Sequence, residues 1–452
     1  MSSRKRAISE VEDAAESDKP GRRPALDHLA EDSTAGESQT YELSYPPKSK
    51  TAAAVPFQQP STLLTFSYTP ERVLEFTDSA LRYYVDPPLR AELKYGYERW
   101  IKRPEEKGRL DGLLKAVLKY RSRVDAGGAD GAAWLRDIAV VSWRGVMTKI
   151  LTAPYEDRDG WELNVMLVDG TLYLEEHTSN EKLVEKEYME PRHRLFSYFG
   201  YSFESYCTSS HPDRREVHAE GRSHPFGWGG DVDTNVQWCA VVKTKLGDQR
   251  LVIGGEVDCV RERFKGSTDT LVELKTSMTI RGPQDEAKFE KKLLKFYFQS
   301  FLLGVPEIVV GFRTPQGQIS TTQSFKTIQI PRMVRGKPHA WDPSICLDWG
   351  HRFLQFLKST LASQTNALRE RSVWRARFSP GSGVTLSPLD DSGVAEVEAG
   401  EDRVGFLPKW YVDELKGRAK PSQDTAANRP APAADPADSV DTSASSQPPA
   451  PG

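Results

Sequence analysis

The chain has 452 residues, 38% of them hydrophobic, and a formal net charge of −3. This length allows one large domain with tails or two to three average domains, and the small negative charge supports nucleic-acid binding only through a local or metal-assisted site. The four scattered cysteines form no C-x-x-C pair, which argues against a zinc ribbon or a disulfide framework, and the lack of a long apolar run or signal peptide predicts an intracellular protein without membrane contact.

The two ends of the chain differ in composition from the rest. Residues 1–55 and 418–452 are rich in small and polar residues and poor in large apolar ones, which is typical of disordered tails. Short basic runs at 4–6 and 22–23 are weak candidates for nuclear import. No linker interrupts residues 56–417, so we expect one large domain there.

The first half of this domain is predicted to mix helices and strands. Apolar spacing predicts a helix at 110–121, and the apolar run 138–151 predicts a strand that carries one cation, Arg144. Asp169-Gly170 lies between two strand-like runs and predicts a hairpin over 161–175. Arg144 has two interpretations, a structural ion pair or a phosphate clamp, since guanidinium can bind phosphate bidentately.

The second half begins with an aromatic helix. Proline followed by aromatic residues at helical spacing predicts this helix at 191–207, where Glu204 is the odd polar member and, taken alone, a surface residue. Periodicity also predicts strands at 236–242 and 308–312 and helices at 285–303 and 349–366. Lys295 and Gln299 lie four residues apart and therefore share one face of their helix.

Two further predicted strands, 251–260 and 271–280, stand at the centre of this pattern. Glu256 and Asp258 interrupt the first apolar run, and Glu273 and Lys275 interrupt the second. Because strand side chains alternate between faces, each pair shares a face, and three carboxylates and one ammonium can converge. Charges inside an apolar strand are costly unless they are paired or bind a metal ion.

Carboxylate oxygens are preferred ligands of Mg²⁺ and Mn²⁺, and a neighbouring lysine could hold a phosphate oxygen or an attacking water. This combination indicates a metal-dependent phosphodiester hydrolase. The alternative is a solvated cross-strand ion pair, although the flanking residues are more apolar than such a face usually carries. The order strand–strand–helix–strand is also that of a PD-(D/E)xK-like nuclease core, an analogy of fold that assigns no substrate.

A series of short motifs lies between about Leu81 and Val412. They are Leu81-Arg82-Tyr83-Tyr84, Trp143-Arg144-Gly145, Gly200-Tyr201-Ser202-Phe203-Glu204, Gly255-Glu256-Val257-Asp258, Glu273-Leu274-Lys275 and Gln299-Ser300-Phe301-Leu302. Each is weak singly, but together they are specific. The chain resembles the eukaryotic decapping exoribonuclease (DXO) family, most of all the fungal nuclear branch that partners the nuclear 5′→3′ exoribonuclease.

The resemblance implies a single α/β (α+β) domain with mixed β-sheets flanked by helices. It implies a hydrolase located in the nucleus that uses Mg²⁺ or Mn²⁺ to remove triphosphate, unmethylated-cap and NAD-cap ends from RNA. It also implies two partners, RNA 5′ ends and the nuclear 5′→3′ exoribonuclease, which the protein would stabilise.

The resemblance further implies roles for individual residues. The metal ligands would be Glu204, Asp258, Glu273 and the main-chain carbonyl of Leu274, with Glu256 contributing to metal or substrate binding. The substrate contacts would be Lys275 and Gln299 at the scissile phosphate or the nucleophilic water, Trp143, Arg144 and Gly145 at the 5′ phosphates, and Cys239 and Arg82 at further positions. This reverses the local interpretation of Glu204 as a surface residue.

Two other functions remain open at this point. A nuclease with the same core could act on DNA, and a non-catalytic protein could stabilise an exoribonuclease. The intact carboxylates and Lys275 argue against a purely structural role.

Overall fold

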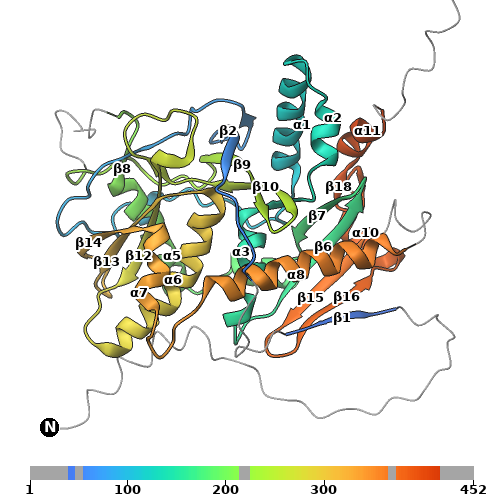
Figure 1. The fold of residues 1–452 in the computed structure, drawn as a ribbon. Helices are drawn as coiled ribbons and strands as arrows, with labels where there is room; N and C mark the ends of the chain where they lie inside the picture. The colour runs from blue at the N-terminus through green and yellow to red at the C-terminus, as the bar shows by residue number, and fades with distance from the viewer. Residues whose placement is uncertain (1–38, 46–53, 213–223, 365–372, 418–452) are drawn as a thin grey trace, which may run out of the picture.

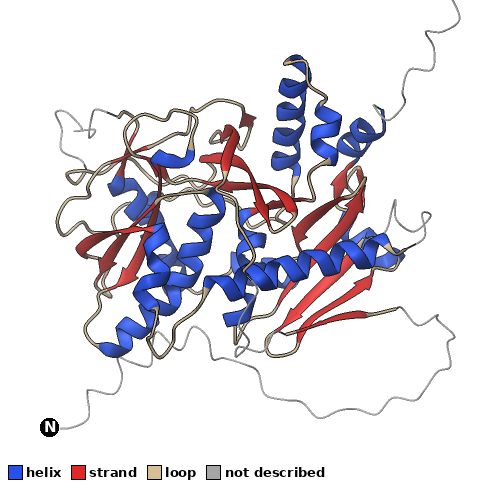
Figure 2. Ribbon diagram, viewed as in Figure 1, coloured by secondary structure: helices blue, strands red, loops and turns tan. Residues whose placement is uncertain are grey.

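The computed structural model describes residues 39–45, 54–212, 224–364 and 373–417. In this part of the chain two mixed β-sheets are joined and flanked by helices (Figures 1 and 2). This architecture confirms the predicted α/β class. The predicted tail at 418–452 lies outside the described residues, as does most of 1–55.

The larger sheet has ten strands. Their order is β1 (Tyr41–Ser44), β16 (Gly383–Pro388), β15 (Trp374–Ser379), β6 (Trp161–Val168), β7 (Thr171–Glu176), β5 (Val140–Trp143), β10 (Gln249–Glu256), β9 (Gln237–Leu246), β2 (Ser61–Tyr68) and β3 (Leu74–Glu75). β5 runs parallel to β7 and β10, and the other pairs are antiparallel. The predicted hairpin is confirmed, with φ of 49° at Asp169 and 83° at Gly170, as a tight two-residue turn requires.

The smaller sheet has six strands. Their order is β14 (Ile319–Lys326), β13 (Glu307–Arg313), β12 (Leu271–Met278), β11 (Cys259–Val260), β4 (Tyr83–Tyr84) and β8 (Thr208–Ser209). β12 and β13 are parallel and are connected by α6 (Pro283–Leu303), as parallel neighbours require a crossover. A third pair, β17 (Arg403–Val404) and β18 (Leu407–Pro408), lies near the C-terminal end of the described chain.

The helices fill the space between the sheets and cover their faces. Besides α6, they are α1 (Asp111–Ala126), α2 (Gly131–Arg136), α3 (Arg144–Thr152), α4 (Asn180–Glu187), α5 (Pro191–Cys207), α7 (Ile330–Val334), α8 (Pro343–Ala362), α10 (Asp391–Glu398) and α11 (Lys409–Gly417). α3 packs against both α6 and α8, and one apolar core runs through these helices and both sheets. α5 packs on β12, and α1 packs on β2 (Figure 1). None of the helices in the described ranges is both long and apolar enough to cross a membrane.

The predictions for residues 138–151 and for the N-terminal segment 1–55 are wrong in part. The run 138–151 is not one strand, because β5 ends at Trp143 and α3 begins at Arg144. Val146, Met147, Ile150 and Leu151 recur at helical spacing and are all buried, a pattern hidden by the preceding apolar strand.

The predicted N-terminal tail is the second correction. Within residues 1–55, Tyr41–Ser44 form β1, which pairs with β16 along its whole length. Tyr45 then donates a hydrogen bond to the carbonyl of Ala153 at 2.7 Å. The composition of the segment obscured the strand, because its stability comes from a partner more than 330 residues away.

Candidate active site

The candidate site lies where the chain crosses from the larger sheet to the smaller one. β10 ends at Glu256, Val257 and Asp258 form the crossing, and β11 begins at Cys259 in the other sheet. The predicted single strand 251–260 is therefore wrong. Glu256 and Asp258 come together because two sheets meet at this point, and not because they alternate along one strand.

Glu273 is the most enclosed member of the group. Its carboxylate is fully buried on β12 and accepts hydrogen bonds from Arg144 Nη1 at 2.8 Å and Lys275 Nζ at 2.6 Å. Burial alone would raise the pKa of Glu273, but the charges and hydrogen bonds of the two cations outweigh it and lower the pKa to about 2. Glu273 therefore stays ionised and positions both cations.

The backbone of β12 holds Asp258 in place. The N–H of Leu274 donates to Asp258 Oδ2 at 2.6 Å, and the Leu274 carbonyl accepts a hydrogen bond from Lys275 Nζ at 3.2 Å. Burial, followed by the charge of Glu273, raises the pKa of Asp258 to about 7. Burial, together with Asp258 and Glu256, also raises the pKa of Glu204 well above its usual value.

Glu204 reaches the site from α5. Figure 1 shows that this helix runs beside the smaller sheet, and it packs on β12. The residues that surround Glu204 in sequence are core residues: Phe203 is fully buried and fills the space left by Gly311 on β13, where a Cβ would lie 2.4 Å from the ring. Packing of Phe203 therefore fixes the rotation of α5 that presents Glu204.

The side chains at the β5–α3 junction, including Arg144, pack closely against β10. Arg144 is the first residue of α3, directly after Trp143, whose Nε1 donates to the carbonyl of Arg109 at 2.9 Å. Gly254 and Gly255 on β10 leave room for these side chains, since a Cβ on Gly254 would lie 2.7 Å from the Trp143 ring and one on Gly255 would lie 2.9 Å from Arg144 Cβ. Two adjacent glycines stand at the end of an apolar strand. This pair is the sequence signal that could have indicated the close approach.

A cavity of about 310 Å³ opens onto the carboxylates. Arg82, Tyr201, Glu204, Gln237, Glu256 and Asp258 are among its lining residues. The amide of Gln237 donates to Glu256 Oε2 at 2.8 Å, and Arg72 Nη1 donates to Gln237 Oε1 at 2.6 Å. Sequence reasoning missed Gln237 and Arg72, because they lie on other elements and belong to no local charge pattern.

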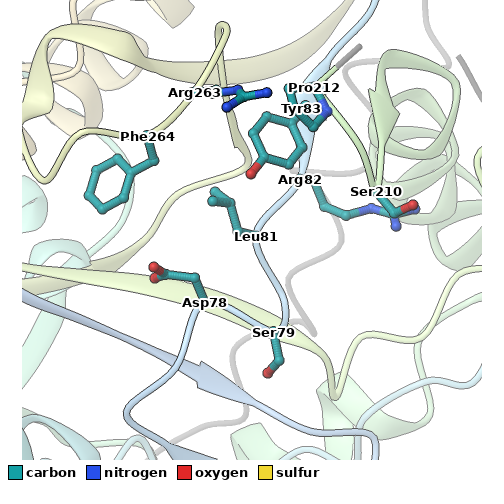
Figure 3. A pocket seen from close by; sticks show the side chains of 9 residues that line it. All are labelled: Asp78, Ser79, Leu81, Arg82, Tyr83, Ser210, Pro212, Arg263 and Phe264. Atoms are coloured by element: carbon teal, nitrogen blue, oxygen red, sulfur yellow. The ribbon is translucent and has the colours of Figure 1, made fainter. Parts of the chain in front are cut away.

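A second hollow, of about 450 Å³, adjoins the first through Ser79 and Arg82, which line both. Figure 3 shows the side chains around it, including the guanidinium groups of Arg82 and Arg263 and the rings of Tyr83 and Phe264. Arg82 also donates to the carbonyl of Gly229 at 2.7 Å.

The remaining predicted residues are placed as follows. Gly145 is the second residue of α3, and a Cβ there would meet nothing within 4 Å. Gln299 lies on α6, and its Oε1 is sealed from solvent without a hydrogen-bond partner among the described residues. Cys239 pairs in register with Glu256 but is buried in an apolar cluster and is not among the residues that line the cavity.

The donor set has the chemistry that a hard divalent cation requires. Four carboxylates (Glu204, Glu256, Asp258 and Glu273) lie together with two cations (Arg144 and Lys275), and burial raises the pKa of Glu204, Glu256 and Asp258. With all four carboxylates ionised the group has four negative and two positive charges, an excess of two, and a divalent cation would favour that ionised state. As the side chains are placed, no three His, Cys, Asp or Glu in the described ranges already form a metal-binding group. The fit therefore rests on the oxygen ligands and on buried carboxylates whose raised pKa a cation would lower.

Comparison with known proteins assigns the family. Residues 58–412 match the family model described as RAI1 like PD-(D/E)XK nuclease. The chain belongs to this family. The match covers both sheets except β1, and it includes every residue of the charge cluster.

Individual relatives agree with this assignment. The chain is 37% identical to the decapping nuclease RAI1 of Mycosarcoma maydis, over 81% of this chain and 89% of the relative. It is 36% identical to the human decapping and exoribonuclease protein, over 79% and 86%. The crystal structure of S. pombe Rai1 in complex with 3′-FADP is 27% identical, covers 78% of this chain and 100% of that one, and has a TM-score of 0.61. Candida albicans Rai1, at 24% identity and a TM-score of 0.69, has the same fold.

Proposed function

We propose that this RAI1-like nuclease hydrolyses the 5′ ends of RNA and removes triphosphate, unmethylated-cap and NAD-cap ends in RNA quality control and processing. Family membership supports hydrolysis, and relatives named decapping nuclease and decapping and exoribonuclease protein support the 5′ end as the target. A relative solved with 3′-FADP supports a pocket for dinucleotide-like ends. The observation that carries the proposal is the cluster of four carboxylates (Glu204, Glu256, Asp258 and Glu273) beside Arg144 and Lys275.

A divalent cation, Mg²⁺ or Mn²⁺, is the cofactor that the cluster would hold. Its ligands would come from Glu204, Asp258, Glu273 and the Leu274 carbonyl. Glu256 would contribute to metal or substrate binding. When bound, such an ion neutralises charge on a phosphoryl group and lowers the pKa of water. Its double positive charge would also lower the pKa of Glu204, Glu256 and Asp258, which burial raises, and would hold these carboxylates in the ionised form.

The cations of this chain would orient the substrate. Arg144 Nη1 and Lys275 Nζ bind the two different oxygens of Glu273, and we expect both to donate to phosphoryl oxygens of a bound 5′ end. Arg144 and Gly145 also form the first turn of α3, which has no side-chain cap. Its backbone N–H groups and the open space at Gly145 suit the 5′ phosphates.

The hollow around Arg82 would receive the nucleotides that follow the 5′ end. Arg82 and Arg263 supply positive charge for the backbone, and Tyr83 and Phe264 supply aromatic surface for bases (Figure 3). This explains how a protein of net charge −3 can bind RNA, because the positive charge is local.

The test uses one RNA sequence that carries a 5′ triphosphate, an unmethylated cap, a methylated cap, NAD or a monophosphate. Each RNA is incubated with Mg²⁺, Mn²⁺ or chelator, and the released 5′ product is identified by mass. We expect pyrophosphate, cap dinucleotide or NAD, and we expect the release to stop in chelator and in Glu273→Gln. Glu42→Gln, an exposed carboxylate on β1, is the matched control and should retain activity.

Two outcomes would redirect the proposal. Equal cleavage of DNA with the same sequence and 5′ phosphorylation would identify a general nuclease. No release from any RNA would leave the carboxylate cluster without its proposed role and favour a function through binding.

A second role, in the nucleus, would be to stabilise a nuclear 5′→3′ exoribonuclease. The resemblance to the fungal nuclear branch and the identity to fungal RAI1 proteins support it. The test adds wild type or Glu273→Gln to the purified exoribonuclease and follows its thermal inactivation. Protection by both proteins would indicate binding independent of hydrolysis, whereas protection by neither would remove this role.

A further inference from the structure

Gln237 is a polar residue at the carboxylate cavity to which the sequence gave no role. It is the first residue of β9 and lines the cavity together with Glu204, Glu256 and Asp258. Its side chain makes two hydrogen bonds: Nε2 donates to Glu256 Oε2 at 2.8 Å, and Oε1 accepts from Arg72 Nη1 at 2.6 Å. The amide therefore joins the carboxylate cluster to a cation outside it.

The strand register places Gln237 beyond the end of β10. β9 and β10 lie side by side (Figure 1), and Cys239 pairs with Glu256, the last residue of β10. Gln237 lies two residues before Cys239 and would pair with Asp258 if β10 continued, but the chain leaves for the smaller sheet. Side chains two residues apart on a strand share a face, so Gln237 and Glu256 point to the same side of the sheet.

Arg72 fixes the direction in which the Gln237 amide points. A guanidinium has N–H donors and no acceptor, so the amide atom that faces Arg72 must be the oxygen. The amide nitrogen then faces Glu256, where it donates. The reverse orientation would set donor against donor at Arg72 and oxygen against oxygen at Glu256.

Arg72 is itself held from several sides. Its guanidinium carbon lies 3.8 Å from the centre of the Tyr68 ring, and Nη1 also donates to the Asn235 carbonyl at 2.9 Å. Its backbone has φ of 63°, in a turn where the Arg72 N–H donates to the Thr69 carbonyl at 2.9 Å. A left-handed conformation at arginine persists only where the surrounding contacts hold it. Arg72 is therefore a well-fixed partner for the Gln237 amide.

The other carboxylates of the cluster have different donors. Glu273 binds two cations, and Asp258 accepts from a backbone N–H. Within the described part of the chain, Gln237 is the residue whose side chain donates a hydrogen bond to the Glu256 carboxylate. A neutral amide stabilises this carboxylate without bringing a further positive charge into the cluster.

We propose that Gln237 is a positioning residue of the active site, whose amide holds one oxygen of Glu256 and leaves the other for the metal ion or the RNA 5′ end. The inference rests on the proposed function, in which Glu256 contributes to metal or substrate binding. Gln237 acts through Glu256 and takes no part in bond breaking itself. Without its N–H donor the carboxylate is free to turn, because β10 has no further residue beside it.

The test is a double-mutant cycle on the hydrolysis of 5′-triphosphate RNA at saturating Mn²⁺. Gln237→Met removes the donor at nearly constant length, and Glu256→Gln removes the charge that accepts from it. We expect Gln237→Met to lower kcat/KM about tenfold, the loss typical of a hydrogen bond to a charged group. In the Glu256→Gln background the same change should alter kcat/KM less than about twofold, because the group that Gln237 positions is already lost.

Ligand affinity is the second readout and requires no turnover. Mn²⁺ is titrated into the metal-free protein by calorimetry, and 5′-triphosphate RNA is titrated in chelator. At least one of these affinities should fall several-fold in Gln237→Met, and the double variant should match Glu256→Gln. Gln323→Met, at an exposed position of β14, is the matched control and should keep wild-type values.

Gln237→Glu separates the donor from the contact with Arg72. It keeps the oxygen that accepts from Arg72 but sets a second carboxylate against Glu256. We expect it to lose at least as much activity as Gln237→Met. If Gln237→Met fails to fold, Gln237→Glu takes its place in the cycle.

Two results would overturn the inference. Equal losses from Gln237→Met with and without Glu256→Gln would show that Gln237 acts independently of Glu256. Unchanged kcat/KM and affinities in Gln237→Met and Gln237→Glu would show that the amide positions nothing. Where wild type hydrolyses RNA, either result leaves the proposed function standing. A wild type that neither hydrolyses RNA nor binds Mn²⁺ would remove the proposed function and this inference together.

Discussion

Replacing Glu273 by glutamine keeps the shape of the side chain and removes the charge that holds Arg144 and Lys275. The pKa of Glu273 is lowered from 4.5 to about 2 because the two cations outweigh burial. A shift of this size corresponds to about 3 kcal/mol of stability at neutral pH, at 1.36 kcal/mol per pKa unit. We therefore expect Glu273→Gln to unfold more easily by a few kcal/mol and to lose 5′-end hydrolysis.

The sign of the pH dependence gives a sharper test. Because the folded-state pKa is depressed, the contribution of Glu273 is present above pH 4.5 and is lost as the pH falls toward 2. The stability gap between wild type and Glu273→Gln should then shrink to roughly half by pH 3. Urea unfolding in chelator at pH 7 and at lower pH measures it, with Glu42→Gln as the control. A variant within about 0.5 kcal/mol of wild type at pH 7 would refute the assigned ion-pair cluster.

Three further predictions concern stability and packing. Glu175 is 1% exposed, and its burial outweighs the charge of Arg109 and raises its pKa to about 7. The free energy of unfolding should therefore fall by on the order of 3 kcal/mol as the pH rises from 4.5 to 7. Glu175→Gln should flatten that fall, as measured by urea midpoints. Gly311→Ala should clash with Phe203, cost about 1–3 kcal/mol and lower kcat on triphosphate RNA, as measured by thermal unfolding and product release. Deletion of residues 1–45 should lower Tm by several degrees relative to deletion of 1–38, because β1 is lost.

Each of these has a clear contrary result. If the urea midpoint of Glu175→Gln falls with pH as steeply as that of wild type, another group titrates in that range. Normal kcat for Gly311→Ala would show that Phe203 does not control the placement of Glu204. Equal Tm for the two deletions would mean that β1 adds nothing to the stability of the sheet.

Local sequence determined much of this protein. The hairpin at Asp169-Gly170 followed from turn chemistry, because both residues accept positive φ. The helices α1, α5 and α6 followed from apolar spacing within one or two turns. The Glu273 and Lys275 pair was visible because polar residues interrupt an apolar strand, and such an interruption is costly without a partner.

Only the tertiary structure decided how these parts meet. The ion pair between Arg144 and Glu273 spans 129 residues, and the break between Glu256 and Asp258 depends on two sheets meeting there. Glu204 resembled a surface residue because its burial is produced by strands distant in sequence. Periodicity reports which side of an element is apolar, whereas the partner of that side is set by long-range packing, which no short stretch of sequence contains.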